Sequence, residues 1–336
     1  MKKNIANGLT LAAIAVVFTG IMTALVFFGV IDEYTAQILS LAGINVIVAL
    51  SLNLISGFTG QLALGHAGFM AVGAYTTAYC IMKLNLPMFL AILIGGLVTA
   101  VFGLVIGFPT LRLRGDYLAI VTLGFGEIIR VIMINLEQIT GGAAGLKGIP
   151  SFTEDILLAP ALSLLWVFSV MIITIILVSN LIKSSYGRAI LSVREDEIAA
   201  NAMGINVFYY KMYAFTISAF IAGVGGGLYA PFFGYLNPTM FNFLKSVDFL
   251  VIVVLGGMGS ITGTVIAGFV LTYLQEFLRF LQDYRLVIYP LLLIFIMLFR
   301  PSGLMGNREI SILGLWQRLF KSKNQSQSKV DKAGER

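Results

Sequence analysis

Long apolar runs recur along almost the whole chain, and they limit the possible folds more than any other feature of the sequence. The hydrocarbon core of a bilayer is about 30 Å thick, so a helix of about 20 mostly apolar residues crosses it. The runs cover residues 9–31, 36–56, 61–82, 86–108, 117–138, 160–182, 207–230, 243–256, 261–281 and 286–299, of which the eighth and tenth are short. We therefore predict an all-α, polytopic membrane protein, a helical bundle of about ten transmembrane helices.

Composition agrees with this class and excludes others. Apolar residues make up 58% of the chain and charged residues 11%, against about 25% charged in a typical soluble domain. The net charge of +6 does not indicate nucleic-acid binding, because the basic residues lie between apolar runs and in the tail rather than in one patch. The single cysteine, Cys80, excludes an internal disulfide and a CxxC metal site. With His66 as the single histidine, we expect no metal, cofactor or catalytic residue.

The distribution of lysine and arginine predicts the orientation in the cell membrane. If the N-terminus lies inside and ten helices cross, both termini and most basic residues are cytoplasmic, as the positive-inside rule requires. Arg130 then lies within the bilayer. The basic residues left outside are Lys83, Lys147, Lys245, Arg279 and Arg285.

One charge-dense passage, residues 184–206, interrupts the apolar runs. Ser192 and Glu195 match a capping box, which predicts a helix over about 193–204 that closes at Gly204. A helix this short and this charged does not cross a bilayer, so we expect it on the cytoplasmic side. We expect one of its faces to rest on the membrane domain and the other to meet a partner. The first face comprises Ile198, Ala199, Ala202 and Met203, and the second comprises Arg194, Glu197 and Asn201.

The passage from Ser51 to Tyr75 is apolar but rich in glycine, and it also contains Asn53, Gln61 and His66. Two interpretations remain open. Glycines allow helices to pack closely in lipid, which would explain their recurrence. Alternatively, the passage is a broken or re-entrant helix that lines a solute path, since lipid supplies no partners for the polar side chains. The candidate path residues here are Asn53, Gly57, Gly60, Gln61, Gly65 and His66.

The fifth run contains Glu127 and Arg130, three positions apart and therefore adjacent on one helix face near mid-bilayer. An unpaired charge at that depth costs roughly 2.5–3.5 kcal/mol. The two side chains either pair with each other, which offsets part of this cost, or one of them faces the path and meets a solute charge. The sequence favours neither interpretation over the other.

Two segments outside the apolar runs complete the chain. The glycine-rich loop 141–159 falls on the outside, where it is either a solvated connector or a surface on which a binding protein docks. Residues 1–308 form the predicted membrane domain. Residues 309–336 form a cytoplasmic tail, whose apolar stretch 310–320 could lie along the inner membrane surface before a disordered, polar end.

Four motifs in a fixed order carry a resemblance to a known family. They are GQLALGHAGFMAVGAY at 60–75, RGDYLAIVTLGFGEIIR at 114–130, TGGAAGLKGIP at 140–150, and the charge-dense passage 184–206. From about residue 40 to Gly306 the chain resembles the LivM-type permeases of branched-chain amino acid ABC importers. The resemblance implies a ten-span subunit that pairs with a LivH-type permease, two cytoplasmic ATPase subunits and an extracytoplasmic solute-binding protein.

The resemblance also implies a role for the charge-dense passage. Its residues Glu197, Ala199, Ala200 and Gly204 match the EAA-type loop, the element that the ATPase holds in importers of this kind. Ile198 separates the glutamate from the paired alanines, which departs from the general pattern.

The expected function is therefore inward transport of branched-chain or similar amino acids across the membrane. No Gly-Lys pair occurs anywhere in the chain, so it contains no P-loop, and the ATPase must be another subunit. The alternative is an ion-coupled secondary transporter of small polar solutes in which Glu127 and Arg130 relay the ion. A membrane enzyme is disfavoured, because no nucleophile, metal or phosphate motif accompanies His66.

Overall fold

The computed structural model describes residues 19–113, 115–153, 155, 158–280 and scattered residues between 287 and 306. The helices are α2 (Glu33–Asn53), α3 (His66–Leu84), α4 (Met88–Thr110), α5 (Asp116–Asn135), α6 (Glu137–Thr140), α7 (Ala159–Lys183), α8 (Ser185–Glu195), α9 (Glu197–Ala202), α10 (Val207–Phe233), α11 (Phe243–Gly256) and α12 (Ile261–Phe277). Shorter elements are the π-helix η1 (Leu54–Phe58), the 3-10 helices η2 (Gly142–Ala144) and η3 (Pro238–Phe241), and the strands β1 (Leu146–Lys147) and β2 (Tyr235–Leu236).

The all-α class predicted from the apolar runs is confirmed. Six stretches are long and apolar enough to cross a membrane, at Glu33–Phe58, Met88–Thr110, Asp116–Asn135, Ala159–Lys183, Val207–Phe233 and Ile261–Phe280. The runs 61–82 and 243–256 correspond to the shorter helices α3 and α11. The run 9–31 is described only from residue 19, the run 286–299 only in scattered residues, and the predicted tail 309–336 lies outside the described residues. The total of ten crossings therefore stays a prediction.

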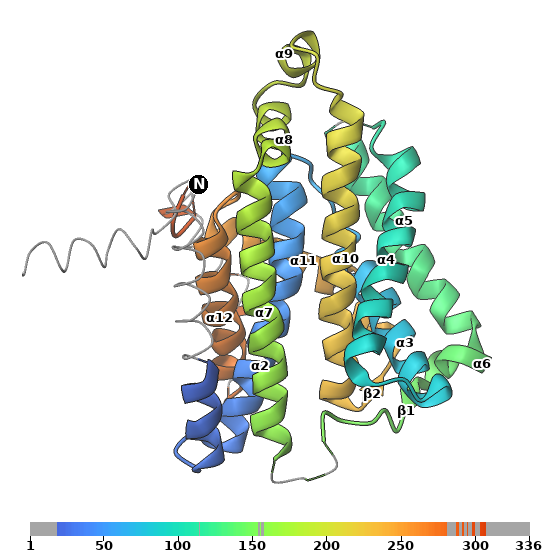
Figure 1. Ribbon diagram of the computed structural model, residues 1–336, viewed down its shortest axis with the longest axis vertical. Coiled ribbons are helices and arrows are strands. Elements are labelled where there is room, and N and C mark those ends of the chain that lie inside the picture. Colours follow the sequence, from blue (N-terminus) through green and yellow to red (C-terminus); the bar gives the residue numbers. More distant parts are fainter. Residues whose placement is uncertain are drawn as a thin grey trace, which may run out of the picture.

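The long helices lie roughly along the long axis of the molecule (Figure 1). The short helices α8 and α9 project at one end, and the β1–β2 pair lies at the other. The two strands are antiparallel, with Leu146 opposite Leu236. The side chain of Asn237 donates to the Ala143 carbonyl at 3.2 Å, which further ties the loop after α5 to the segment after α10. Part of the loop 141–159 is thus fixed to the bundle.

Contacts between small residues hold α3, α4 and α10 together. A Cβ atom added at Gly73 of α3 would lie 2.1 Å from the carbonyl oxygen of Gly223 in α10. A Cβ at Gly223 would lie 2.4 Å from Oγ1 of Thr99 in α4. Close backbone approach between membrane helices depends on such small residues, because lipid chains are as apolar as the helices themselves. The packing interpretation of the glycines therefore holds for α3.

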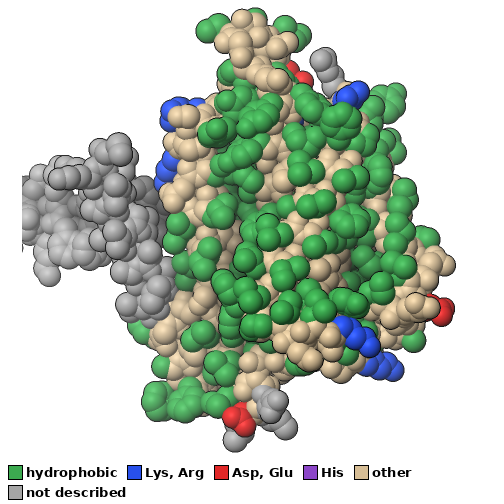
Figure 2. Space-filling view, turned by 45° about the vertical axis from the view of Figure 1, so that its right-hand side comes forward, with side chains coloured by type: hydrophobic (Ala, Val, Ile, Leu, Met, Phe, Trp, Pro, Cys, Tyr) green, Lys and Arg blue, Asp and Glu red, His purple; other side chains and the backbone are tan. Residues whose placement is uncertain are grey.

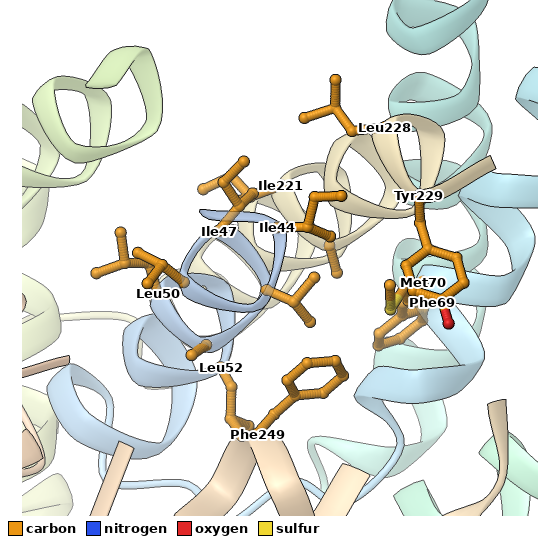
Figure 3. Packing of buried hydrophobic residues seen from close by; sticks show 14 of the residues in the cluster. Ile44, Ile47, Leu50, Leu52, Phe69, Met70, Ile221, Leu228, Tyr229 and Phe249 are labelled. Carbon is orange, nitrogen blue, oxygen red and sulfur yellow. The ribbon is translucent and has the colours of Figure 1, made fainter. Parts of the chain in front are cut away.

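Helix α2 runs through the middle of the packed core. Its side chains from Ile44 to Asn53 are all buried. Figure 3 shows Ile44 and Ile47 beside Ile221 of α10, with Phe249 of α11 on another side of the same helix. A helix that is apolar on all sides is buried on all sides, which is the position that α2 occupies.

The outward surface of α4 is apolar along its whole length. Its exposed side chains include Phe89, Leu93, Leu97, Val101, Val105 and Phe108. The face turned forward in Figure 2 is likewise a broad apolar band, with charged side chains near its upper and lower ends. An apolar surface of this extent is suited to contact with lipid chains.

The glycine contact predicts that Gly73→Val destabilises the subunit. The new side chain meets backbone atoms of Gly223, which cannot move aside as a side chain could. We therefore expect the free energy of unfolding to fall by about 1–3 kcal/mol. Thermal unfolding of the detergent-solubilised subunit measures the loss. The control is Gly124→Ala in α5, where an added Cβ meets no atom within 4 Å and the unfolding temperature should not fall. Equal unfolding temperatures for both variants would contradict the packing described here.

Candidate functional site

The polypeptide is not helical between η1 and α3, so the glycine-rich passage contains a break as well as close packing. Gly60 in this segment has a φ of +73°, a conformation that few other residues adopt. The first residue of α3, His66, contacts Ser218, which lies eleven positions into the 27-residue helix α10. Helix α3 therefore begins inside the bundle rather than at its end, as expected for a broken helix in a membrane.

Asn53 ties this break to a second one, the turn between α11 and α12. Its side-chain amide donates to the Ser260 carbonyl at 3.0 Å and to Oγ1 of Thr264 at 2.8 Å. Its oxygen accepts a hydrogen bond from the Gly259 amide at 2.8 Å. A Cβ on Gly57 would lie 1.8 Å from that oxygen, so the contact requires glycine there. Of the predicted path residues, Asn53 and Gly57 thus have a clear structural task.

His66 is completely buried and lies in a chain of hydrogen bonds. Ser218 donates its hydroxyl proton to the Ser51 carbonyl at 2.5 Å, so it accepts from Nε2 of His66 at 3.0 Å. This arrangement fixes the proton on Nε2 and leaves Nδ1 as an acceptor. Nδ1 has no hydrogen-bond partner among the described residues.

Three further buried atoms near the break also lack a partner in the described part of the chain. They are Oγ of Ser56 and both side-chain polar atoms of Gln61. A buried polar group without a partner costs about 1–3 kcal/mol, so native structures rarely retain several in one place. Together with Nδ1 of His66, these atoms are hydrogen-bonding groups that the described chain leaves unused, all within residues 56–66.

The other glycine of the break, Gly65, packs against the backbone of Thr122 in α5. A Cβ added at Gly65 would lie 2.4 Å from the Thr122 carbonyl oxygen.

Glu127 and Arg130 form the ion pair that their spacing allows. Nε of Arg130 donates to Oε2 of Glu127 at 2.7 Å, and the two side chains are 26% and 34% exposed for Arg130 and Glu127 respectively. Charge-assisted hydrogen bonds of this length are among the stronger interactions in proteins. The pairing interpretation is therefore confirmed for the geometry, whereas a direct contact with a solute stays a prediction.

The structure adds two charged residues that the sequence analysis did not select. Lys245, in the predicted run 243–256, lies in α11, where its Nζ donates to Oδ1 of Asn45 at 3.3 Å. Asn45 is twelve positions from Glu33 and thirteen from Phe58, at the middle of that span. Asp248 follows Lys245 at the i+3 position on the same helix. Opposite charges three apart within the short run 243–256 are the same signal that marked Glu127 and Arg130, and applying it there would have found them.

The expected single helix over 193–204 is wrong, because two shorter helices cover this passage. Ser192 lies inside α8 and its hydroxyl donates to the Ala189 carbonyl at 2.8 Å, so it does not cap a helix. The cap is Asp196, whose Oδ1 accepts from the amides of Ile198 and Ala199 at 2.8 and 3.0 Å. An aspartate with extended backbone is as good an N-cap as serine, and here it competes successfully. Gly204 has the expected left-handed conformation, with a φ of +83°.

The face expected to rest on the membrane domain is instead exposed. Ile198 and Met203 are 78% and 83% exposed, and Ala199 and Ala202 are exposed too. The contacts that hold α9 to the bundle are the buried Ala200 and an ion pair between Glu197 and Lys211 of α10. With only six residues, α9 extends past the end of the bundle (Figure 1), so two apolar side chains remain without a covering neighbour in the described chain.

Helix α8 meets both breaks through Arg194. A Cβ on Gly60 would lie 3.2 Å from Cγ of Arg194, and a Cβ on Gly259 would lie 2.7 Å from its Nη1. Both glycines have positive φ values, which few other residues adopt. The nearby arginine also leaves little room for a side chain at either position. The projecting segment and the two helix breaks thus converge on one side chain.

The sequence of this chain is similar to those of known proteins. A family model described as "Branched-chain amino acid transport system / permease component" matches residues 34–297. The permease LivM of Escherichia coli strain K12 is 37% identical over 82% of this chain and 71% of its own length. LivH of the same strain is 33% identical over 38% of this chain and 42% of its own length. A probable LivM of Methanocaldococcus jannaschii is 24% identical over 83% of this chain and 95% of its own length. No solved structure matches.

The structure is thus a helical bundle with stretches long and apolar enough to span a membrane, a broken helix and a projecting short helix. The match over most of the chain then identifies the family: the chain belongs to the permease components of branched-chain amino acid transport systems.

The ion pair in α5 predicts different results for single and double substitutions. Glu127→Gln strands Arg130, so subunit abundance in the membrane should fall. Combining it with Arg130→Met removes both charges and should restore abundance. If the pair serves folding alone, uptake of leucine returns with abundance, and this is the result we expect. A double mutant that is abundant but fails to transport would show instead that one side chain meets the solute.

Proposed function

We propose that this chain is the LivM-type permease subunit of an ATP-driven importer for branched-chain or similar hydrophobic amino acids. The observation that carries the proposal is the projecting α8–α9 segment on a bundle that belongs to this family. The chain has no P-loop, so the subunit supplies the path and a docking element rather than the hydrolysis of ATP. The membrane domain forms the path together with a LivH-type permease.

The docking element is the segment from Glu197 to Gly204, which we assign to contact with the cytoplasmic ATPase. Exposed Ile198 and Met203 provide the apolar surface that such a contact needs, since exposed apolar groups beside a polar rim commonly mark protein interfaces. The ion pair of Glu197 with Lys211 fixes this surface to the start of α10. Two ATPase subunits, one for each permease, complete the cytoplasmic side.

The solute path, in this proposal, runs beside the break between η1 and α3. Unused hydrogen-bonding atoms of Gln61 and His66 are suited to water or to the polar groups of an amino acid. The glycines at 57, 60 and 65 permit close contacts between the break and other parts of the bundle. The break therefore faces protein rather than lipid. On the opposite side of the membrane, the loop fixed by β1 and β2 is the surface that we assign to an extracytoplasmic solute-binding protein.

An ion-coupled secondary transporter is less well supported. Its relay residues were expected to be Glu127 and Arg130, but Arg130 already binds the carboxylate of Glu127 at 2.7 Å. A carboxylate engaged in an ion pair is a poor proton or sodium carrier, because the arginine stabilises its charged form and occupies one oxygen.

The proposal predicts the sidedness of two exposed residues. In a Cys80→Ser background, which removes the only thiol, a cysteine at Asn201 in α9 lies in the cytoplasm and a cysteine at Ser151 lies outside. Impermeant maleimide applied to intact cells should label the Ser151 position and not the Asn201 position. Permeabilised cells should show labelling at both. Labelling of Asn201→Cys in intact cells would overturn the cytoplasmic placement of α9.

A second prediction concerns coupling. Gly204→Val forces a β-branched residue into the left-handed region at a site with open space, so the cost of about 1–2 kcal/mol falls on the backbone of the segment alone. Leucine-stimulated ATP hydrolysis by the assembled complex in liposomes should then fall strongly, while the membrane domain stays folded. Gly204→Asn is the matched control, since asparagine tolerates this conformation and should retain most of the stimulation. Full stimulation with valine would remove this segment as the coupling element.

A further inference from the structure

Helix α5 is the least covered of the spanning helices. Only 22% of its most apolar 18-residue stretch is buried, against 72% for α10 and 83% for α2. Its inner side packs on α3 through Gly65 and Gly68. Its outer side is exposed or half-buried among the described residues. We name the open side the α5 outer face. It comprises Tyr117, Ile120, Gly124, Glu127, Ile128 and Val131, with Arg130 at its border.

No described residue of the chain packs closely against Gly124 on this face. The other glycine of the central part of α5, Gly126, faces inward, where an added Cβ would lie 3.3 Å from Cα of Gly65. At Gly124 an added Cβ would meet nothing within 4 Å, and the residue is helical. Glycine is a poor helix former, so a half-exposed helical glycine that no described residue crowds is better explained by a neighbour from another chain. In membranes such a neighbour is commonly another helix in close approach.

The charges of the face exclude lipid as its full covering. Glu127 is eleven positions from Asp116 and eight from Asn135, close to the middle of the helix. Its side chain and that of Arg130 both remain partly exposed there although they are paired. The outer surface of α4 has no comparable feature, since its exposed side chains are apolar throughout. At this depth only lipid chains, another membrane helix or a solute path can lie against a side chain, and charged groups there face protein or water.

We propose that the α5 outer face is the contact surface for the second permease subunit, with a helix of that subunit seated over Gly124 and its polar groups against Glu127 and Arg130. The inference rests on the proposed function, because it takes its occupant from the pairing of two permeases. Similarity of this chain to relatives of both the LivM and the LivH kind indicates a partner that is itself a helical membrane subunit of related sequence. A helix of such a subunit supplies the close approach that Gly124 allows and the polar groups that the ion pair needs.

The first test compares Gly124→Trp with Val101→Trp. Val101 lies on the apolar outer surface of α4 and is 57% exposed, so both variants place the same large side chain on an open helix surface. The chain is co-expressed with an affinity-tagged second permease and with the ATPase subunits, and the complex is purified through the tag. We expect Gly124→Trp to reduce recovery of this chain at least about tenfold, as overpacking of a close contact does, and Val101→Trp to leave it unchanged. Equal recovery of both variants would overturn the proposal.

A cross-linking experiment keeps the proposal testable if Gly124→Trp reduces folding. Benzoylphenylalanine is placed at Ile128, one turn from Gly124 and 52% exposed, and separately at Val101 as the control. Irradiation of membranes that contain the assembled transporter should join the chain to the tagged second permease from Ile128 and not from Val101. A product with a second copy of this chain, or a product from Val101 alone, would overturn the assignment.

The two experiments also separate this inference from the function on which it rests. If the unsubstituted chain purifies with the second permease and the ATPase, but Ile128 gives no cross-link, the surface is wrong and the importer stands. If the unsubstituted chain purifies with neither subunit, the proposed function itself fails.

Discussion

The arrangement of the whole bundle depends on the direct contact of backbones between α3 and α10. Gly73 and Gly223 approach so closely that neither position accepts a Cβ atom, and Thr99 of α4 completes the contact. Water cannot drive helices together inside a membrane, so dispersion between closely fitted surfaces must do it. With α3 fixed against α10, its first residue His66 lies beside Ser218, and the chain has to bend between η1 and α3 to reach that place.

The fold class could be predicted from the sequence, because a run of apolar residues constrains a helix without reference to the rest of the chain. The six long spans fall where the runs predicted them. The sequence alone could not decide whether the glycines before α3 mark close packing or a helix break, since glycine serves both. In the structure Gly73 serves the first purpose and Gly60 the second, and the difference depends on which atoms of distant helices lie opposite.

The candidate site was predictable in its residues more than in its contacts. The spacing of Glu127 and Arg130 was enough to predict their ion pair, since both lie on one turn. The partner of Asn53 lies more than two hundred positions away in sequence, so no local pattern indicated it. The helix start at Asp196 was missed because serine and aspartate compete as caps, and the choice depends on where α8 ends. The contact of Lys245 with Asn45 was not predicted, because Asn45 belongs to a different helix.

The side chain of Arg194 contacts both helix breaks. It lies against Gly60 and Gly259, while Asn53 holds the turn of Gly259 to the end of α2. Both turns present glycine at the point of contact, so the Arg194 side chain lies directly against their backbone. Both turns therefore pack against one side chain of α8. One residue of a short projecting helix thus joins two helix breaks that are far apart in sequence.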